Sequence, residues 1–255
     1  MPLLNLRLAK PKMLIDLNRI PGLDGIDEVS GELSIGAMAR QGSIERSFVV
    51  KQRCPILAAA MRYIGHVAIR HRGTIGGSLA HADPAAEIPA IALALDAKFE
   101  VIRNGSGRTI PAEAFFLDYL TTALAPDEIL KEIIFPFLQP SAGYAVEEIT
   151  RRHGDFAIAG VAAVVEMDER GEIAGARIAL FGVAPTAVRA RRAEDALKGQ
   201  KPTTKIIRDA ASLLEDSLEP FSDIHASEAY RKHVAAVLTI RALERAVQRR
   251  QKREM

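Results

Sequence analysis

Cysteine is nearly absent from this sequence, because Cys54 is the only one among 255 residues. A single cysteine cannot form a disulfide within the chain, nor hold an iron–sulfur cluster or a CxxC metal site. Tryptophan is absent and aromatic residues make up 5% of the chain, which disfavours a surface that stacks on single-stranded nucleic acid. We therefore expect a protein of a reducing compartment, the cytoplasm.

Excess charge and long apolar runs are missing too. The formal net charge is +2, so the charge indicates neither nucleic acid nor a membrane surface as a partner. No run of about eighteen apolar residues and no signal-peptide pattern occurs, so we expect no transmembrane segment. The chain does have 48% hydrophobic residues, enough for the core of one large domain or two smaller ones.

The first half of the sequence alternates irregularly between strand-like and helix-like segments. Apolar or alternating runs predict strands at 13–17, 32–36, 98–103 and 128–135. Helical spacing predicts a helix over 55–65, and Asn-Gly-Ser-Gly at 104–107 is typical of a hairpin turn. This order favours an α+β fold over a regular βαβ series.

The second half is simpler. Both periodicities break at 136–143, which predicts a domain boundary. Three strand-like runs follow, at 143–150, 157–168 and 174–182, and then helical patterns at about 189–198, 204–218 and 227 to the end. The pattern indicates a three-stranded meander backed by a helical bundle.

The stretch from Arg70 to Pro89 contains the residues best suited to bind a ligand. Its three glycines lie beside Thr74 and Ser78, and successive glycine N–H groups can form an anion nest to which hydroxyls add donors. It matches neither the GxGxxG nor the Gly-Lys-Ser/Thr fingerprint of nucleotide sites. A glycine turn that merely tightens a strand–helix connection explains the same residues, so both interpretations stay open.

The acidic and histidine residues in and beside this stretch suggest few further roles in binding or catalysis. We expect Asp83 to cap the next helix, and Glu87 is the better candidate to face a ribose or ribityl hydroxyl. His81 could hydrogen-bond a ligand, although a lone histidine in a loop is more often simply at the surface. His66 and His71 have no cysteine or carboxylate neighbours at ligand spacing, so no metal site is expected. No arrangement of nucleophile and base identifies a catalytic residue.

The motif Arg-x-x-Gly-Thr-Ile-Gly-Gly-Ser-Leu-Ala-His-Ala-Asp-Pro resembles the second flavin-binding motif of the FAD subunits of molybdenum hydroxylases. This family includes the medium chain of carbon monoxide dehydrogenase and the FAD domain of xanthine dehydrogenase. Segments 5–9, 14–18 and 151–157 resemble it too. The resemblance implies a PCMH-type, vanillyl-alcohol-oxidase-like FAD-binding domain over 1–138. It also implies a C-terminal domain over 143–255, with three antiparallel strands and a helical bundle.

The resemblance also implies the cofactor-binding residues. The residues expected to wrap the FAD pyrophosphate through backbone N–H groups are Thr74, Ile75, Gly76, Gly77 and Ser78. Glu87 takes the place of an acid, usually Asp, that binds the sugar-like chain of the flavin, and Leu130 is expected near the adenine or flavin ring. Glu147 or Glu148 stands where some relatives have a lysine, so no lysine contact to the flavin is carried over. No catalytic residue is implied, because the protein binds, orients and tunes the flavin.

Electron transfer within a complex is the implied activity. A molybdopterin-binding large subunit oxidises the substrate, and a small subunit with two-iron two-sulfur clusters passes electrons to this FAD. The FAD then delivers them to NAD, a quinone or oxygen. The expected assembly is a dimer of heterotrimers. The lone Cys54 agrees with this division, because it cannot hold those clusters on this chain.

The start of the sequence departs from the family pattern. Relatives have a strand, a helix and a first glycine loop, Ala-Gly-Gly-x-Ser, ahead of the position of Asn5, whereas this sequence starts at Met1. A misassigned start or a truncation would explain the difference, and we expect a chain without this loop to bind FAD weakly or not at all. Two other functions therefore remain as alternatives to an FAD-binding electron-transfer subunit. One is an FAD-free scaffold or assembly subunit of the same complex, and the other is a stand-alone flavin reductase.

Overall fold

The computed structural model describes residues 2–5, 7–215 and 218–254. The first part of the chain forms a five-stranded antiparallel sheet, a short hairpin and a set of short helices. Its elements are α1 (Pro2–Asn5), β1 (Ile26–Val29), β2 (Glu32–Gly36), α2 (Gln41–Arg46), α3 (Phe48–Arg53), α4 (Pro55–Ala60), α5 (Val67–Arg70), α6 (Ile75–His81), α7 (Glu87–Ala94), β3 (Lys98–Arg103), β4 (Ser106–Pro111), α8 (Ala112–Phe115), β5 (Phe116–Asp118), β6 (Thr121–Thr122) and β7 (Ile129–Pro136).

The second part forms a four-stranded antiparallel sheet and three helices. Its elements are β8 (Gly143–Ile149), β9 (Ala159–Met167), β10 (Ile173–Phe181), β11 (Val188–Arg189), α9 (Arg191–Leu197), α10 (Thr204–Ser212) and α11 (Glu228–Glu254). No helix in the described part of the chain has the length and apolarity needed to cross a membrane.

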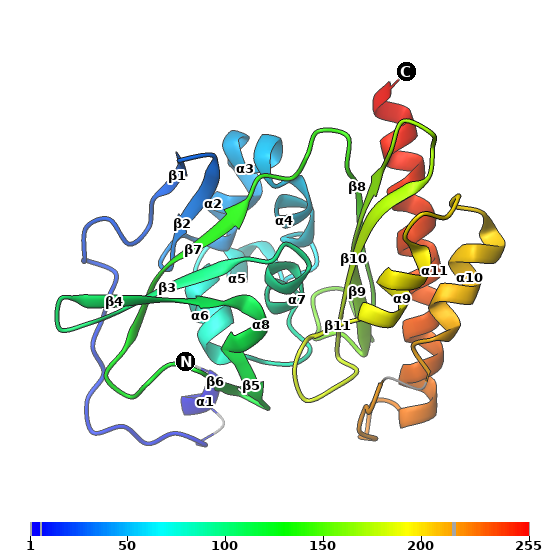
Figure 1. The fold of residues 1–255 in the computed structure, drawn as a ribbon. Coiled ribbons are helices and arrows are strands. Elements are labelled where there is room, and N and C mark those ends of the chain that lie inside the picture. Colours follow the sequence, from blue (N-terminus) through cyan, green and yellow to red (C-terminus); the bar gives the residue numbers. More distant parts are fainter. Residues whose placement is uncertain (1, 6, 216–217, 255) are drawn as a thin grey trace.

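The two sheets and their helices are stacked in alternating layers, sheet, helices, sheet, helices (Figure 1). The first sheet has the strand order β1-β2-β7-β3-β4, and the second has the order β11-β10-β9-β8. Helix α7 lies between them and contacts both β9 and β10. The helical layer of the first part therefore also covers the second sheet, and we call this contact the seam.

Alternation of side chains accounts for the core of the first sheet. Leu33 and Ile35 on β2 lie opposite Phe135 and Ile133 on β7. Because side chains alternate along a strand, these four share one face of the sheet, and all four are fully buried. The polar residues between them, such as Ser34, lie on the other face.

The second sheet is buried on both of its faces. Val161, Ala163 and Val165 of β9 pack with helix α11, whereas Ala162 and Val164 belong to the core shared with the first part of the chain. A strand that is covered on both faces has a nearly continuous apolar sequence. This explains why 157–168 shows no polar alternation. The three predicted strands of the meander 143–182 are confirmed, but the sheet has a fourth strand, because the short β11 pairs with β10.

Two predicted elements differ from the structure. Segment 13–17 forms no strand, and the side chains of Met13, Leu14 and Ile15 are exposed by 76%, 64% and 77%. An apolar run becomes a buried strand only beside a strand edge that can pair with it, and no such pairing occurs here among the described residues. The predicted helix over 55–65 ends at Ala60, because the chain then turns toward Gly65 with its positive φ of +48°.

The remaining helices are present but shorter than predicted. The predicted helix 204–218 ends at Ser212, and its residues 216–217 lie outside the described part of the chain. The predicted turn at 104–107 is confirmed, since β3 and β4 form a hairpin around it. Met1, where the sequence starts, is also outside the described residues.

We predict that Gly143→Ala destabilises the protein, because a Cβ at this position would lie 1.9 Å from the backbone oxygen of Ala246 on α11. Overpacking of this kind typically costs about 1–3 kcal/mol. The free energy of unfolding in urea measures the effect. Gly175→Ala on β10 is the control, because its Cβ would meet only Glu166 Oε2 at 4.0 Å. Equal stability of the two variants would contradict the prediction.

Candidate functional site

The glycine motif lies at the start of helix α6. Thr74 has an extended backbone, with φ −113° and ψ 156°, and its Oγ1 accepts a hydrogen bond from the Gly77 N–H at 3.0 Å. This is a regular N-cap. The helix ends at Ala82 in the left-handed conformation. Gly76 and Gly77 therefore lie in the first turn of a short helix rather than in an open loop.

The segment that follows β2 holds the motif in place. The Gly76 N–H donates to the Ala37 oxygen at 2.8 Å, and the Ile75 N–H donates to the Ala39 oxygen at 3.1 Å. A Cβ on Gly76 would lie 2.5 Å from the Ala37 Cβ, closer than such atoms approach. Gly76 is therefore a glycine because the backbone packs tightly here. This is the second of the two interpretations that the sequence allowed.

The backbone N–H groups of the motif donate hydrogen bonds within the protein. Those of Ile75 and Gly76 point toward the segment after β2, and those of Gly77 and Ser78 donate to Thr74. Ile75 is fully buried. The parts of the motif that solvent can reach are Gly77, which is exposed, and Thr74 and Ser78, which are half-buried. A phosphate at this helix would meet these three residues.

Glu87 and Asp83 have environments that the sequence did not predict. Glu87 lies in the first turn of α7 and is only 6% exposed. Burial, with the nearby charge of Asp83, raises the pKa of Glu87 to about 7. Asp83 does not cap α7, whose N-cap is Ala86. Its Oδ1 instead accepts from the Ala85 N–H at 2.9 Å and fixes the turn before the helix.

Leu130 is a core residue. It lies on β7 opposite Val101 of β3, is 6% exposed, and belongs to the hydrophobic core of the first sheet. Its strand contacts α6. His81, the last residue of α6, is half-buried, and its Nε2 lies 3.8 Å from Asp83 Oδ2.

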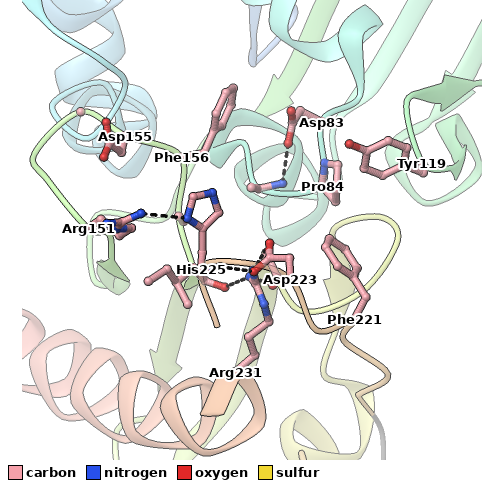
Figure 2. Close-up of a pocket in the computed structure, with 15 residues that line it drawn as sticks. Asp83, Pro84, Tyr119, Arg151, Asp155, Phe156, Phe221, Asp223, His225 and Arg231 are labelled. Atoms are coloured by element: carbon pink, nitrogen blue, oxygen red, sulfur yellow. Dashed lines mark hydrogen bonds and ion pairs between the residues drawn. The ribbon is translucent and has the colours of Figure 1, made fainter. Parts of the chain in front are cut away.

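A cavity of about 590 Å³ adjoins the end of the motif. Most of its walls come from the turn at Asp83 and Pro84, the connection between β8 and β9, and the residues before and within the first turn of α11, as Figure 2 shows. Tyr119, between β5 and β6, and Gly182, after β10, complete the lining. Aromatic side chains of Tyr119, Phe156 and Phe221 line it together with charged groups. A planar ligand with polar substituents would find both kinds of contact here.

Arg231 fixes one wall of this cavity. The side chain is 4% exposed, and its guanidinium donates to the Gly182 oxygen at 2.9 Å and to Asp223 Oδ2 at 2.7 Å. The Gly182 N–H in turn donates to the Pro84 oxygen at 2.7 Å. A continuous set of hydrogen bonds therefore joins helix α11, through Gly182, to the end of the glycine motif. The Arg231–Asp223 part of this set is visible in Figure 2.

Sequence reasoning missed most of the cavity. It pointed to 151–157 through resemblance alone and did not identify Tyr119, Phe221 or Arg231. A signal for Arg231 was present, because it lies on the face of α11 that Val234 and Leu238 assign to the core. In the ranges described above, no group of three or more potential metal ligands is brought together.

Known proteins resemble this chain over nearly its full length. Family models for the "FAD binding domain in molybdopterin dehydrogenase" and the "CO dehydrogenase flavoprotein C-terminal domain" match residues 1–138 and 144–246. The 6-hydroxypseudooxynicotine dehydrogenase complex subunit alpha of Paenarthrobacter nicotinovorans is 39% identical over 97% of this chain and 84% of the relative. The carbon monoxide dehydrogenase medium chain of Hydrogenophaga pseudoflava is 37% identical over 96% of this chain and 85% of the relative.

Solved structures show the same fold. A carbon monoxide dehydrogenase from Hydrogenophaga pseudoflava that lacks the Mo-pyranopterin moiety matches with a TM-score of 0.94 and 40% identity, over 97% of this chain and 86% of that chain. Quinoline 2-oxidoreductase from Pseudomonas putida 86 matches with a TM-score of 0.92 and 36% identity, over 97% of this chain and 86% of that chain.

We predict that Thr74→Val lowers stability by about 1 kcal/mol, the usual cost of losing an N-cap side chain. Valine keeps the shape of threonine but cannot accept the Gly77 N–H bond. Thr74→Ser retains the hydroxyl and is expected to stay within a few tenths of a kcal/mol of the wild type. Urea unfolding of the three proteins measures both effects. A serine variant as unstable as the valine variant would contradict the cap assignment.

Proposed function

Because the chain belongs to the family of FAD-binding medium subunits of molybdopterin dehydrogenases, we propose that it carries electrons between two partners of such a complex. It is an oxidoreductase subunit with FAD as its cofactor. Electrons would arrive from two-iron two-sulfur clusters of a small subunit and leave to an external acceptor. Substrate oxidation would take place on a molybdopterin-binding large subunit, in a cytoplasmic dimer of heterotrimers.

The glycine motif and the seam would hold the FAD. In this proposal, an FAD-binding domain over 1–138 presents Thr74–Ser78 and Glu87, and a domain over 143–255 closes the site. The structure offers one clear point of fit, since the Glu87 carboxyl is buried and forms no ion pair within the described ranges. Hydroxyl donors of the sugar-like chain would satisfy such a carboxyl. Gly77 and Ser78, at the reachable end of α6, would meet the pyrophosphate.

The chemistry would belong to the cofactor. Bound FAD can exchange electrons singly or in pairs, so it links one-electron clusters to a two-electron acceptor. The side chains of this protein would bind and orient the FAD, keep water away from it and set its electrostatic surroundings. Leu130, a core residue on β7, would lie near the adenine or flavin ring.

The external acceptor would approach through the cavity beside Asp83. This cavity of about 590 Å³ combines aromatic walls with Arg151 and Arg231, and it opens next to the end of the flavin motif. NAD and quinones both contain flat rings that such walls can pack against. The observation that carries the whole proposal is this juxtaposition: a motif held rigidly on the segment after β2, with the cavity at its end.

The first test is the flavin content of the purified chain. We expect the full chain to be yellow, with one FAD per protein, and Gly76→Ala to bind FAD about tenfold more weakly because α6 is forced away from Ala37. Fluorescence titration of the apoprotein with FAD measures the affinity. Gly175→Ala is again the control, since it lies on β10. A colourless wild-type chain that FAD cannot reconstitute would overturn the proposal in favour of a scaffold.

The second test concerns the acceptor. Phe156 lines the cavity and is 61% exposed. A ring contact of this kind contributes about 0.5–1.5 kcal/mol, so Phe156→Ala is expected to raise the KM for the acceptor roughly two- to tenfold with unchanged FAD content. Phe48→Ala is the matched control, because Phe48 is 71% exposed on α3 and does not line the cavity. Equal KM values in both variants would remove the cavity from the proposal.

A further inference from the structure

A groove of about 470 Å³ lies beside helix α4, bordered by α2, α3, α5 and the start of β8. Part of its wall is small and apolar, because Pro55, Ala58 and Ala59 of α4 line it. Tyr144 of β8 contributes an aromatic ring, and the Arg249 guanidinium lies over this ring at 4.2 Å from the centroid. We call this hollow the α4 groove. It shares no lining residue with the cavity described above.

The charged residues of the α4 groove give it an excess of positive charge. Arg70 is buried and is neutralised by Glu45, whose Oε2 accepts from the Arg70 Nε at 2.9 Å. Arg46, Lys51 and Arg62 are exposed, and they form no ion pair with any described residue. Glu45 is the one carboxylate in the lining. Three positive charges of the groove therefore stay uncompensated.

Exposed apolar side chains accompany these cations. Val67, which lines the α4 groove, and Ile69, on the same helix, are exposed by 58% and 57%. Both lie on α5, a helix of four residues that also supplies Arg70 to the groove. Apolar contacts surrounded by a polar and charged rim are the usual composition of a protein–protein interface. The α4 groove and α5 therefore suit a protein partner better than a small ion.

A single turn of the chain separates the α4 groove from the cavity beside Asp83. The Arg70 guanidinium donates to the Ile64 oxygen at 3.0 Å and to the Gly65 oxygen at 3.1 Å. The other side of this turn is packed against Gly154, where a Cβ would lie 3.1 Å from the Gly65 oxygen. Gly154 in turn lines the cavity. A protein seated in the groove would thus lie one packed turn away from the cavity.

A second copy of this chain is a poor occupant of the α4 groove. Contacts between identical copies are most often two-fold symmetric, so that each copy presents the same surface to the other. Three uncompensated positive charges would then face three others, and like charges across an interface oppose binding. A protein surface with Asp and Glu side chains supplies the opposite charge instead.

We propose that the α4 groove is the docking site for an acidic segment of the electron-donating small subunit. The identity of this partner rests on the proposed function. Arg46, Lys51 and Arg62 face carboxylates of the partner, and Val67 and Ile69 provide the apolar contact. Because charges at the rim of an interface act mainly on the association rate, association slows as the salt concentration rises.

Binding of the full chain to the purified small iron–sulfur subunit tests the site. The double variant Lys51→Glu, Arg62→Glu is expected to bind at least about tenfold more weakly at low salt, chiefly through slower association. Arg46 is left unchanged, because its Nη1 lies 3.2 Å from His71 Nε2. Biolayer interferometry at two salt concentrations measures the rates, and urea unfolding checks that the variants are folded.

The matched control carries the same two changes of charge on another helix. Lys205 and Arg208 are exposed on α10, outside the lining of the groove. Lys205→Glu, Arg208→Glu is expected to keep the affinity and the salt dependence of the wild type. Equal affinities of the two double variants would overturn the docking site.

Cross-linking identifies the occupant directly. A carbodiimide joins a lysine amine to a carboxylate that touches it, without a spacer. In the assembled complex, we expect Lys51 to be joined to an Asp or Glu of the small subunit, and Lys205 not to be. A complex that forms without the Lys51 cross-link, or a cross-link from Lys51 to a second copy of this chain, would overturn the proposal.

The outcomes separate the docking site from the proposed function. A small subunit that binds through the α4 groove to a colourless chain would refute the flavoprotein and support the docking site. A yellow chain that does not bind the small subunit would overturn the docking site, while its FAD content would still support the cofactor.

Discussion

The two backbone hydrogen bonds from Ile75 and Gly76 to the segment after β2 fix the rest of the site. They are possible only because Gly76 has no Cβ, so helix α6 can start in direct contact with Ala37. Once its first turn is held there, the cap at Thr74 and the turn after Ala82 set the direction in which the chain leaves. That direction carries Asp83, Pro84 and Glu87 to the second sheet.

The second constraint is that one helical layer serves two sheets. Helix α7 is buried along its whole length, because the first part of the chain covers one side of it and β9 and β10 cover the other. An amphipathic helix could not occupy this place, and the apolar run Ile88–Leu95 suits it. A carboxyl group in this layer is shielded from water, which is the situation of Glu87 at the first turn of α7 and raises its pKa to about 7.

The sequence was sufficient for three of the four strands of the second sheet, missed the short strand β11, and was insufficient for the fine geometry of the motif. Runs such as 157–168 identify strands because both faces of β9 are apolar, and this depends only on local composition. The run at 13–17 is also mostly apolar but pairs with no strand among the described residues, so periodicity alone misassigned it. The glycines gave a similar ambiguity. An anion nest and a close backbone contact both require glycine, and only the position of Ala37 separates them.

The cavity could not be predicted for a related reason. Its walls come from residues as far apart as Asp83 and Arg231, and sequence spacing carries no information about such encounters. Arg231 does show what physical reasoning can add: an arginine on the apolar face of a helix must find acceptors inside the protein. It finds them at Gly182 and Asp223. Because Gly182 also binds Pro84, burying one cation on α11 helps to fix the loop at which the flavin motif ends.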